Sequence, residues 1–154
     1  MRLTKQTNYA LRIMMYCAAN DGKLSQVPEI AAAYGLSDVF LFKILRPLTK
    51  NGLIESVRGR NGGIRLTQAA NAIKLSEVVR MTEDNFEMAE CFKQDGTNCP
   101  LLDSCELNSI LREALDAFFA VLDRYTVADL ATSRYPIERL LGLDLLDSAA
   151  QISS

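Results

Sequence analysis

Apolar and polar positions alternate with the period of an α-helix over the first fifty residues. Segment 4–19 places four apolar side chains on one side, and it predicts a helix that Thr4 or Thr7 can cap and that turn residues end at 20–22. The predicted inward face comprises Leu11, Met14, Met15 and Ala18. Cys17 lies within the same helix, and we expect it to be a small buried hydrophobe.

Residues 25–51 have the pattern of a helix-turn-helix. A short helix over 27–34 carries Pro28 in its first turn, and Gly35 supplies the left-handed residue that closes it. Ser37 is a good N-cap for a second helix, which Gly52 stops. In this motif the second helix enters the major groove of DNA with its N-terminal residues against the base edges.

The second helix divides into two faces. Its inward stripe comprises Leu41, Ile44, Leu45 and Leu48, and its outward residues comprise Val39, Phe40, Lys43 and Arg46. Phe40 and Phe42 are two positions apart and cannot both be buried easily. We therefore expect Phe40 to touch a thymine methyl group or, equally, to pack against a partner. Pro47 lacks an N–H group and predicts a kink or an early end of this helix.

Residues 53–67 predict two short strands joined by a turn at Asn61, Gly62 and Gly63. A hairpin directly after a helix-turn-helix forms a winged helix, and this wing carries Arg58, Arg60 and Arg65. Glycines let the backbone approach phosphates closely, and arginines favour a narrow minor groove.

Residues 68–84 return to a helix, whose apolar face comprises Leu75, Val78, Val79 and Thr82, with Ser76 near its start.

The longest predicted helix covers residues 106–125. A heptad seam with 4-3-4-3 spacing comprises Leu111, Leu115, Phe118, Leu122 and Tyr125, and the adjacent stripe comprises Ile110, Ala114, Ala117 and Val121. We interpret this wide apolar surface as a dimerisation helix, the alternative being a core helix of a monomer. Thr126 can cap a further short helix, residues 136–146 are expected to pack, and residues 147–154 are expected to fray.

Charge divides the chain after the predicted wing. Residues 1–67 carry ten Lys and Arg against four Asp and Glu, a balance of +6, whereas residues 68–154 carry seven against fifteen, a balance of −8. One face that meets phosphate would produce this asymmetry, and so would a dipolar enzyme surface.

The chain has no histidine, and it shows no catalytic motif, so we predict a non-enzyme without a small-molecule substrate. No apolar run reaches ~18 residues and no secretory signal is visible, which predicts a cytoplasmic protein without membrane contact.

Three of the four cysteines lie in one loop with the spacing C-x7-C-x5-C, at Cys91, Cys99 and Cys105. A disulfide would leave one thiol over and needs oxidising conditions, and structural zinc commonly takes four Cys or His ligands. Three thiolates can hold three irons of a [4Fe–4S] cluster, and the fourth iron then needs another ligand. The acidic residues before Cys91 suit a cationic centre or, equally, a solvated linker. Spacing alone leaves these alternatives open.

Three stretches together resemble the winged-helix iron–sulfur repressors, the family of IscR and NsrR: the start M-R-L-T-K-Q-T-N-Y-A-L-R, the wing V-R-G-R-N-G-G-I-R-L, and the cysteine loop before a long helix. A-E-C-F and C-P-L-x-D-S-C-x-L-N most resemble its rhizobial iron-regulator (RirA) branch. The resemblance covers nearly the whole chain. It implies a homodimer with crossed long helices that binds a palindromic double-stranded DNA operator. It also implies an iron–sulfur cluster on Cys91, Cys99 and Cys105, of the [4Fe–4S] type, that degrades to [2Fe–2S] or to the apo protein.

The fourth ligand departs from the family. One branch uses a histidine just after the third cysteine, where this chain has Asn108, and another uses an aspartate in the N-terminal segment, where this chain has Asn8. Both asparagines are poor iron ligands, so the resemblance implies a labile cluster that suits a sensor of iron supply. We expect a repressor of iron-uptake genes that releases DNA when the cluster degrades. The alternatives are a nitric-oxide or redox-sensing repressor of the same fold and, less favoured, an iron–sulfur redox protein.

The predicted fold is mainly α-helical with a small β-hairpin wing. It comprises a winged helix-turn-helix domain over 1–84, a cysteine loop over 85–105, a dimerisation helix with C-terminal helices over 106–146, and a tail over 147–154. The predicted DNA-binding residues come from the N-terminal segment, the second helix of the motif and the wing. They are Thr4, Lys5, Ser37, Val39, Phe40, Lys43, Arg46, Arg58, Arg60, Asn61 and Gly62.

Overall fold

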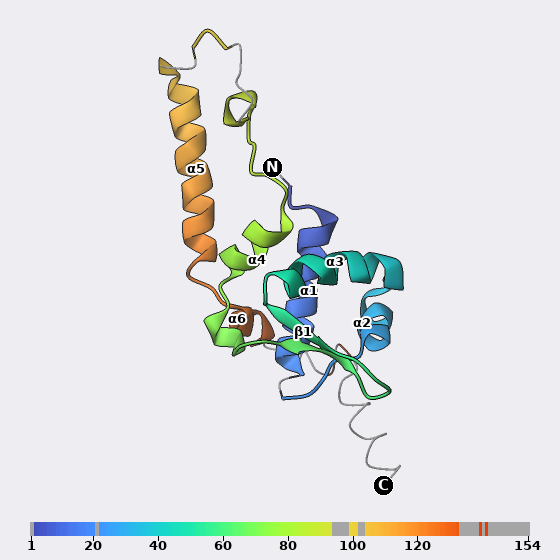
Figure 1. Ribbon diagram of the computed structural model, residues 1–154. Coiled ribbons are helices and arrows are strands. Elements are labelled where there is room, and N and C mark those ends of the chain that lie inside the picture. Colours follow the sequence, from blue (N-terminus) through green and yellow to red (C-terminus); the bar gives the residue numbers. More distant parts are fainter. Residues whose placement is uncertain are drawn as a thin grey trace.

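The computed structural model describes residues 2–20, 22–93, 99–101, 104–132, 139 and 141. A winged-helix body is followed by an extended segment and by one long helix that stands beside that segment (Figure 1). The elements are α1 (Lys5–Ala19), α2 (Val27–Tyr34), α3 (Asp38–Lys50), β1 (Ile54–Val57), β2 (Gly63–Leu66), η1 (Ala70–Ala72), α4 (Leu75–Thr82), η2 (Glu90–Phe92), α5 (Glu106–Leu122) and α6 (Val127–Ala131). The predictions for 136–146 and 147–154 lie outside the described residues, apart from positions 139 and 141. The mainly helical fold with a hairpin wing is confirmed.

Helix α1 is the centre of the body and contacts α3, α4, α6 and β2. Thr4 is its N-cap, as predicted, and the Thr4 side chain accepts a hydrogen bond from the backbone N–H of Thr7 at 3.2 Å. Its buried face comprises Thr7, Ala10, Ile13, Met14, Tyr16 and Cys17. The predicted inward face is therefore only partly correct: Met14 is buried, Leu11 and Ala18 are half-buried against the core, and Met15 is half-buried. Both stripes are apolar, and the helices packed around α1 decide which of them is covered.

The helix-turn-helix forms as predicted. Gly35 ends α2 in the left-handed conformation, with φ 61°, and the N–H of Leu36 donates to the carbonyl oxygen of Ala31 at 2.9 Å. Ser37 caps α3, where its side chain accepts from the N–H of Phe40 at 3.4 Å. Since both ends of the turn are fixed by these bonds, the direction in which α3 leaves α2 follows from local sequence.

Pro47 does not end α3, so that prediction of an early end is wrong. The helix continues to Lys50, and Leu48 is fully buried beyond the proline. Asn51 secures the last turn, because its backbone N–H and its side-chain amide both donate to the carbonyl oxygen of Pro47, at 3.0 Å and 2.9 Å. Burial and this C-terminal cap offset the hydrogen bond that Pro47 cannot make.

Strands β1 and β2 pair antiparallel, with Ile54 opposite Leu66 and Val57 opposite Gly63. The loop therefore covers residues 58–62, and Gly63 lies in the strand rather than in the predicted turn. The N–H and carbonyl groups of Ile64 pair with those of Ser25, both at 2.8 Å, which adds a third segment to the edge of the hairpin. A Cβ at Gly63 would lie 2.7 Å from the carbonyl oxygen of Ser25, so this close approach requires glycine.

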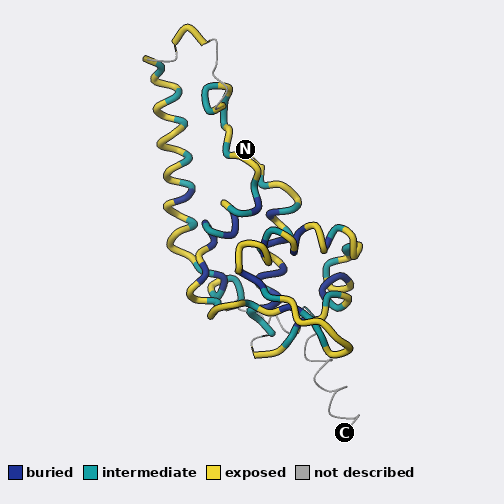
Figure 2. Tube along the Cα trace, in the orientation of Figure 1, coloured by how far each residue is buried: buried dark blue, intermediate teal, exposed yellow. Residues whose placement is uncertain are grey.

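Helix α4 buries Leu75, Ser76, Val78, Val79 and Thr82, which confirms the predicted face. Helix α6 docks on η1 and α1 and begins with a capping box, in which the carboxylate of Asp129 accepts from the backbone N–H and the hydroxyl of Thr126 at 2.6 Å and 2.7 Å. Buried residues concentrate in this body, whereas α5 is mostly exposed or half-buried (Figure 2). Across the described ranges, the structure contains no helix that is both long and apolar enough to cross a membrane.

Candidate nucleic-acid interface and cysteine loop

One side of α3 is a continuous exposed stripe. Lys43, Arg46 and Lys50 give it positive charge, and Asp38 is its single acidic residue. Leu41, Ile44, Leu45 and Leu48 are buried on the opposite side, which confirms the predicted inward stripe. The full exposed stripe, which we call the α3 stripe, comprises Asp38, Val39, Phe42, Lys43, Arg46, Thr49 and Lys50. It is the surface of the helix-turn-helix that a major groove can reach.

Phe40, which we expect on the outward face, lies instead against the body. It is half-buried, and its ring meets the Tyr9 ring edge to face with centroids 5.8 Å apart. Phe42 takes the exposed position, with 59% of its surface accessible. Helical spacing does not separate the two rings, because Phe42 is three positions after Val39 and Phe40 is three positions before Lys43. Contact with Tyr9 on α1 is what covers Phe40.

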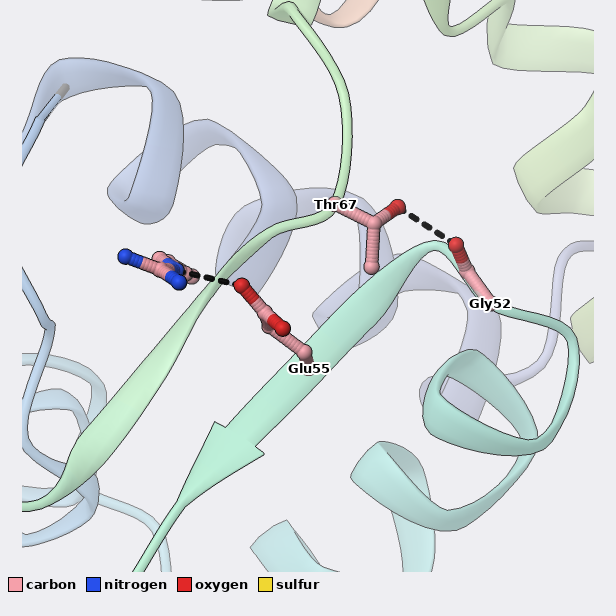
Figure 3. A network of polar contacts seen from close by, with 4 residues as sticks. Gly52, Glu55 and Thr67 are labelled. Carbon is pink, nitrogen blue, oxygen red and sulfur yellow. Dashed lines mark hydrogen bonds and ion pairs between the residues drawn. The ribbon is translucent and has the colours of Figure 1, made fainter.

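The wing presents Arg58, Arg60 and Asn61 as exposed side chains on the loop between the strands. Arg65 is different, because it forms an ion pair with Glu55 directly across the hairpin (Figure 3). The hydroxyl of Thr67 donates to the carbonyl oxygen of Gly52 and closes the base of the hairpin. Among the described residues, Arg58 and Arg60 form no ion pair, so the wing offers two unpaired arginines rather than the three that its sequence carries.

Glycines at the wing serve the hairpin itself. A Cβ at Gly62 would collide with the carbonyl oxygen of Val57, and the N–H of Gly62 donates to the carbonyl oxygen of Gly59 at 3.0 Å. Gly59 has a φ of 118°, a conformation that favours glycine. Close packing thus accounts for Gly62 and the backbone conformation for Gly59, and contact of Gly62 with DNA stays a prediction.

The N-terminal segment is hydrogen-bonded to the C-terminal end of α4. The backbone N–H of Thr4 donates to the Glu83 carboxylate at 2.7 Å, across 79 positions of sequence. Glu83 is the C-cap of α4, at the start of the segment that leads to the cysteines. Lys5 and Asn8 are exposed on the first turns of α1. Sequence reasoning missed this bond, because nothing local marks two residues so far apart as partners.

The cysteine loop begins close to this contact. Cys91 lies in η2 and is half-buried, Cys99 is exposed, and Cys105 is half-buried at the N-cap position of α5. The donor chemistry suits a thiolate-bound iron–sulfur cluster. Within the described positions, which omit 94–98 and 102–103, no three Cys, Asp or Glu side chains come together as a metal-binding group. The donor set therefore fits, while the described part of the loop holds no formed site.

Asn108, one turn into α5 from Cys105, already has a partner. Its side-chain oxygen accepts a hydrogen bond from the guanidinium of Arg112 at 3.1 Å. The same guanidinium lies 4.9 Å from the centre of the Phe92 ring, next to Cys91. Arg112 thus bridges the two ends of the cysteine loop and engages the oxygen that the Asn108 fourth-ligand prediction needs.

Cys17 is chemically unlike the loop cysteines. It is 5% exposed in the core, and burial raises the pKa of its thiol to about 12. Burial likewise raises the pKa of the neighbouring Tyr16 to about 12. A thiol held protonated at neutral pH is a poor metal ligand and a poor nucleophile, which confirms the expectation that Cys17 is a packing residue.

Helix α5 leaves most of its apolar side chains uncovered. Of its 17 residues, all described, Phe119 alone is buried, held by the Phe86 ring at 4.8 Å and by the guanidinium of Arg80 at 3.5 Å from its ring centre. Leu107, Ile110 and Val121 are 61%, 58% and 43% exposed. The helix ends at Leu122, short of the predicted 125, because the carbonyl oxygen of Tyr125 accepts from the N–H of Leu75 and draws the chain toward α4.

The chain matches the Rrf2 family, described as iron-dependent transcriptional regulators, over residues 3–133. Protein aau3 of Rhizobium meliloti (strain 1021) is 62% identical to it, with 94% of both chains covered. The HTH-type transcriptional regulator NsrR of Halalkalibacterium halodurans is 44% identical, with 93% of this chain and 99% of the relative covered. Among solved structures, the oxidized form of Staphylococcus aureus CymR superposes with a TM-score of 0.70 at 26% identity, and the match covers 88% of this chain and 99% of CymR.

These relatives confirm the resemblance drawn from the start, the wing and the cysteine loop. Because the family consists of transcriptional regulators, they also confirm that the chain is a DNA-binding regulator and not an enzyme. The family match spans the winged-helix body, the cysteine loop and α5. This chain therefore belongs to the Rrf2 family of winged-helix transcriptional regulators.

Proposed function

We propose that this chain represses iron-uptake genes while Cys91, Cys99 and Cys105 hold an iron–sulfur cluster, and that it leaves its operator when the cluster degrades. The observation that carries the proposal is the place of the three thiols: they lie in the one segment that joins the DNA-binding body to α5. When bound, a [4Fe–4S] cluster would cross-link the cysteines of this segment, and the cross-link would form only when iron is available. No other group of the chain combines thiol chemistry with exposure to solvent, as far as the described residues extend.

The segment after α4 can carry this signal to the body. Its start is tied to α1 by the bond from Thr4 to Glu83, and its middle packs on α5 through Phe86 and Phe119. Phe92 then lies against Arg112 of α5. Ligation by Cys91 and Cys105 would fix the two ends of the loop, and through these contacts it would restrict how α5 can lie relative to α1. A useful switch needs about 1–3 kcal/mol of coupling between ligation and DNA binding.

A homodimer through α5 is supported by the surface that this helix leaves open. Its exposed side chains include Leu107, Ile110 and Val121, and a cleft of about 740 Å³ separates it from the segment that carries Phe86 and Phe92. A second α5 would cover this apolar surface. Two α3 stripes would then meet successive major grooves about 34 Å apart, which requires a palindromic operator.

We assign DNA contact to the exposed cations and polar groups of three segments. Lys43 and Arg46 lie in the α3 stripe, and Arg58, Arg60 and Asn61 lie on the wing loop. Thr4, Lys5, Ser37, Val39 and Gly62 complete the proposed interface, with Phe42 in the place first given to Phe40. The fourth cluster ligand is assigned to the neighbourhood of Asn8 or Asn108, and the bond from Arg112 to Asn108 supports a weak and exchangeable fourth site.

A nitric-oxide or redox signal is the second candidate. The family that the sequence resembles includes NsrR as its nitric-oxide-sensitive repressor, and the 44% identity to NsrR of Halalkalibacterium halodurans favours this signal. It differs from the first only in what destroys the cluster. An iron–sulfur redox carrier is disfavoured, because the family relatives are transcriptional regulators.

The test is anaerobic native mass spectrometry of the full chain during titration with an iron chelator, with operator binding followed in parallel. We expect a cluster-bound dimer whose DNA affinity falls as iron leaves at low chelator concentration. A cluster that survives chelator and collapses with nitric oxide would favour the second candidate. A cluster-free dimer that binds DNA equally well would refute the switch at Cys91 to Cys105.

A further inference from the structure

Two apolar side chains lie uncovered in the middle of the α3 stripe. Val39 is 82% exposed and Phe42 is 59% exposed, in a helix whose other large apolar residues are buried or half-buried. They are three positions apart and therefore adjacent on the helix surface, in its first two turns. An exposed phenylalanine contributes nothing to the core, so its position calls for a partner outside the chain.

The surroundings of Phe42 leave its ring accessible. It borders an open hollow of about 320 Å³ between α2, α3 and the hairpin, whose lining includes Val27, Leu45, Arg46, Lys50 and Ile64. By contrast, Phe40 is occupied by Tyr9. Phe42 is thus the one aromatic ring of α3, a helix described in full, that is exposed.

The charges around the pair select the kind of partner. Lys43 follows Val39 by one helical turn, and Arg46 follows Phe42 by one turn, so both apolar residues are flanked by cations. Protein interfaces are depleted of charge at their centres, which disfavours a second protein on this patch. Nucleic acid offers what both residue types need, phosphates and guanine edges for the cations and one apolar group for the ring.

That apolar group is the C5-methyl of thymine, the only hydrocarbon group on a major-groove base edge. We propose that Phe42, together with Val39, selects thymine in the operator half-site by contact with its methyl group. The inference rests on the proposed function in that α3 must enter the major groove, but it does not depend on iron. In this proposal, apolar contact by Phe42 and Val39 contributes to recognition of the operator sequence, in addition to the contacts that Lys43 and Arg46 make with DNA.

The experiment removes the methyl group and nothing else. Duplexes that the full-length protein, prepared without oxygen, selects from a random-sequence pool are remade with each thymine replaced singly by deoxyuridine, which keeps every base-pairing atom. We expect one thymine position in each half-site at which the replacement weakens binding about four-fold, the factor for removing one methylene-sized group from contact. Phe42→Ala should weaken binding to the thymine duplex and bind thymine and deoxyuridine duplexes equally.

Each outcome decides the proposal. Gln68→Ala, at an exposed position outside the α3 stripe and the wing loop, serves as the control and should keep the four-fold preference. If deoxyuridine has no effect at any position, or if Phe42→Ala keeps the preference of the original chain, Phe42 does not read thymine, while DNA binding itself stands. If the protein selects no duplex at all, the proposed function fails as well. Because Phe42 is exposed, the variant should melt at an unchanged temperature, which separates lost readout from lost folding.

Discussion

The winged-helix body and α5 carry the same kinds of apolar side chain, but the body buries most of its own whereas α5 buries few. Each isoleucine of the body between residues 4 and 82 is at most 1% exposed, namely Ile13, Ile30, Ile44, Ile54, Ile64 and Ile73. In α5, Ile110 is 58% exposed and Leu107 61% exposed. The body therefore completes its own core, whereas α5 leaves an apolar surface that the other described residues do not cover and that we propose a second subunit covers. Regulation suits the second region, because parts with few buried contacts rearrange at low energetic cost.

Cys17 lies in the body, whereas Cys91, Cys99 and Cys105 lie in the cysteine loop. Substitutions that compare the two kinds of cysteine should have the largest effect on iron binding and repression. Cys99→Ala should abolish iron binding and iron-dependent repression, because it removes one of three proposed thiolate ligands. Cys17→Ala should keep both and lower the free energy of unfolding by about 1 kcal/mol, since it leaves a small defect in the core. Iron and sulfide content of anaerobically purified protein measures the first effect, and thermal unfolding of the apo proteins measures the second. Iron-dependent repression retained by Cys99→Ala would refute the ligand assignment.

A pair of isoleucine substitutions tests the difference in burial directly. Ile44→Ala should lower the free energy of unfolding by about 3 kcal/mol, because it creates a cavity beneath α3. Ile110→Ala removes the same atoms from an exposed position and should change subunit unfolding by less than about 0.5 kcal/mol while it weakens self-association. Urea unfolding at two protein concentrations and sedimentation equilibrium separate these effects. Unchanged self-association in Ile110→Ala would count against α5 as the dimer helix.

Sequence predicted the body better than the second region, and the reasons differ from residue to residue. Gly35, Ser37 and the buried stripe of α3 follow from local rules of capping and period, which act within a few residues. Pro47 misled the prediction, because the propensity of a single residue does not include the amide of Asn51 that secures the turn beyond it. Tertiary burial overrides such local costs.

Two apolar residues that lie two positions apart on a helix are harder to tell apart. Phe40 and Phe42 have the same chemistry, and only the placement of Tyr9 on α1 decides which ring is covered. The bond from Thr4 to Glu83 was equally invisible, because it joins positions 79 apart. Asn108 could be singled out by its distance from Cys105 in sequence, but its engagement by Arg112 depends on the rotamers of α5.

Arginines from the two regions should differ in the salt dependence of DNA binding. If a dimer neutralises six to ten phosphates, the slope of log affinity against log salt is about −5 to −9. Arg60→Ala, which acts twice in a dimer, should make this slope shallower by up to about 2, and Arg124→Ala at the end of α5 should leave it unchanged. Both side chains are exposed, so neither variant should affect folding. Fluorescence anisotropy with operator DNA over a roughly six-fold range of salt concentration, from about 50 to about 300 mM, measures the slope. A slope near zero for the unsubstituted protein would refute the assignment of the DNA-binding surface to the body.

The smallest expected effect lies at the contact that joins the regions. Glu83→Ala removes the acceptor of the Thr4 N–H at an exposed position, so the free energy of unfolding should fall by less than about 1 kcal/mol. Glu83→Gln keeps an oxygen acceptor and serves as the control. Hydrogen exchange should quicken at the amide of Thr4 in Glu83→Ala and stay unchanged at Leu41 in α3.

The same pair of variants shows whether the contact does more than stabilise. If the Glu83 carboxylate transmits loop ligation to α1, the ratio of operator affinities with and without iron should shrink in Glu83→Ala and persist in Glu83→Gln. A ratio unchanged in both would mean that the body responds to iron through α5 and the second subunit alone. In that case the covered body and the uncovered region would communicate only after dimerisation, and Ile110→Ala, rather than Glu83→Ala, would uncouple DNA binding from iron.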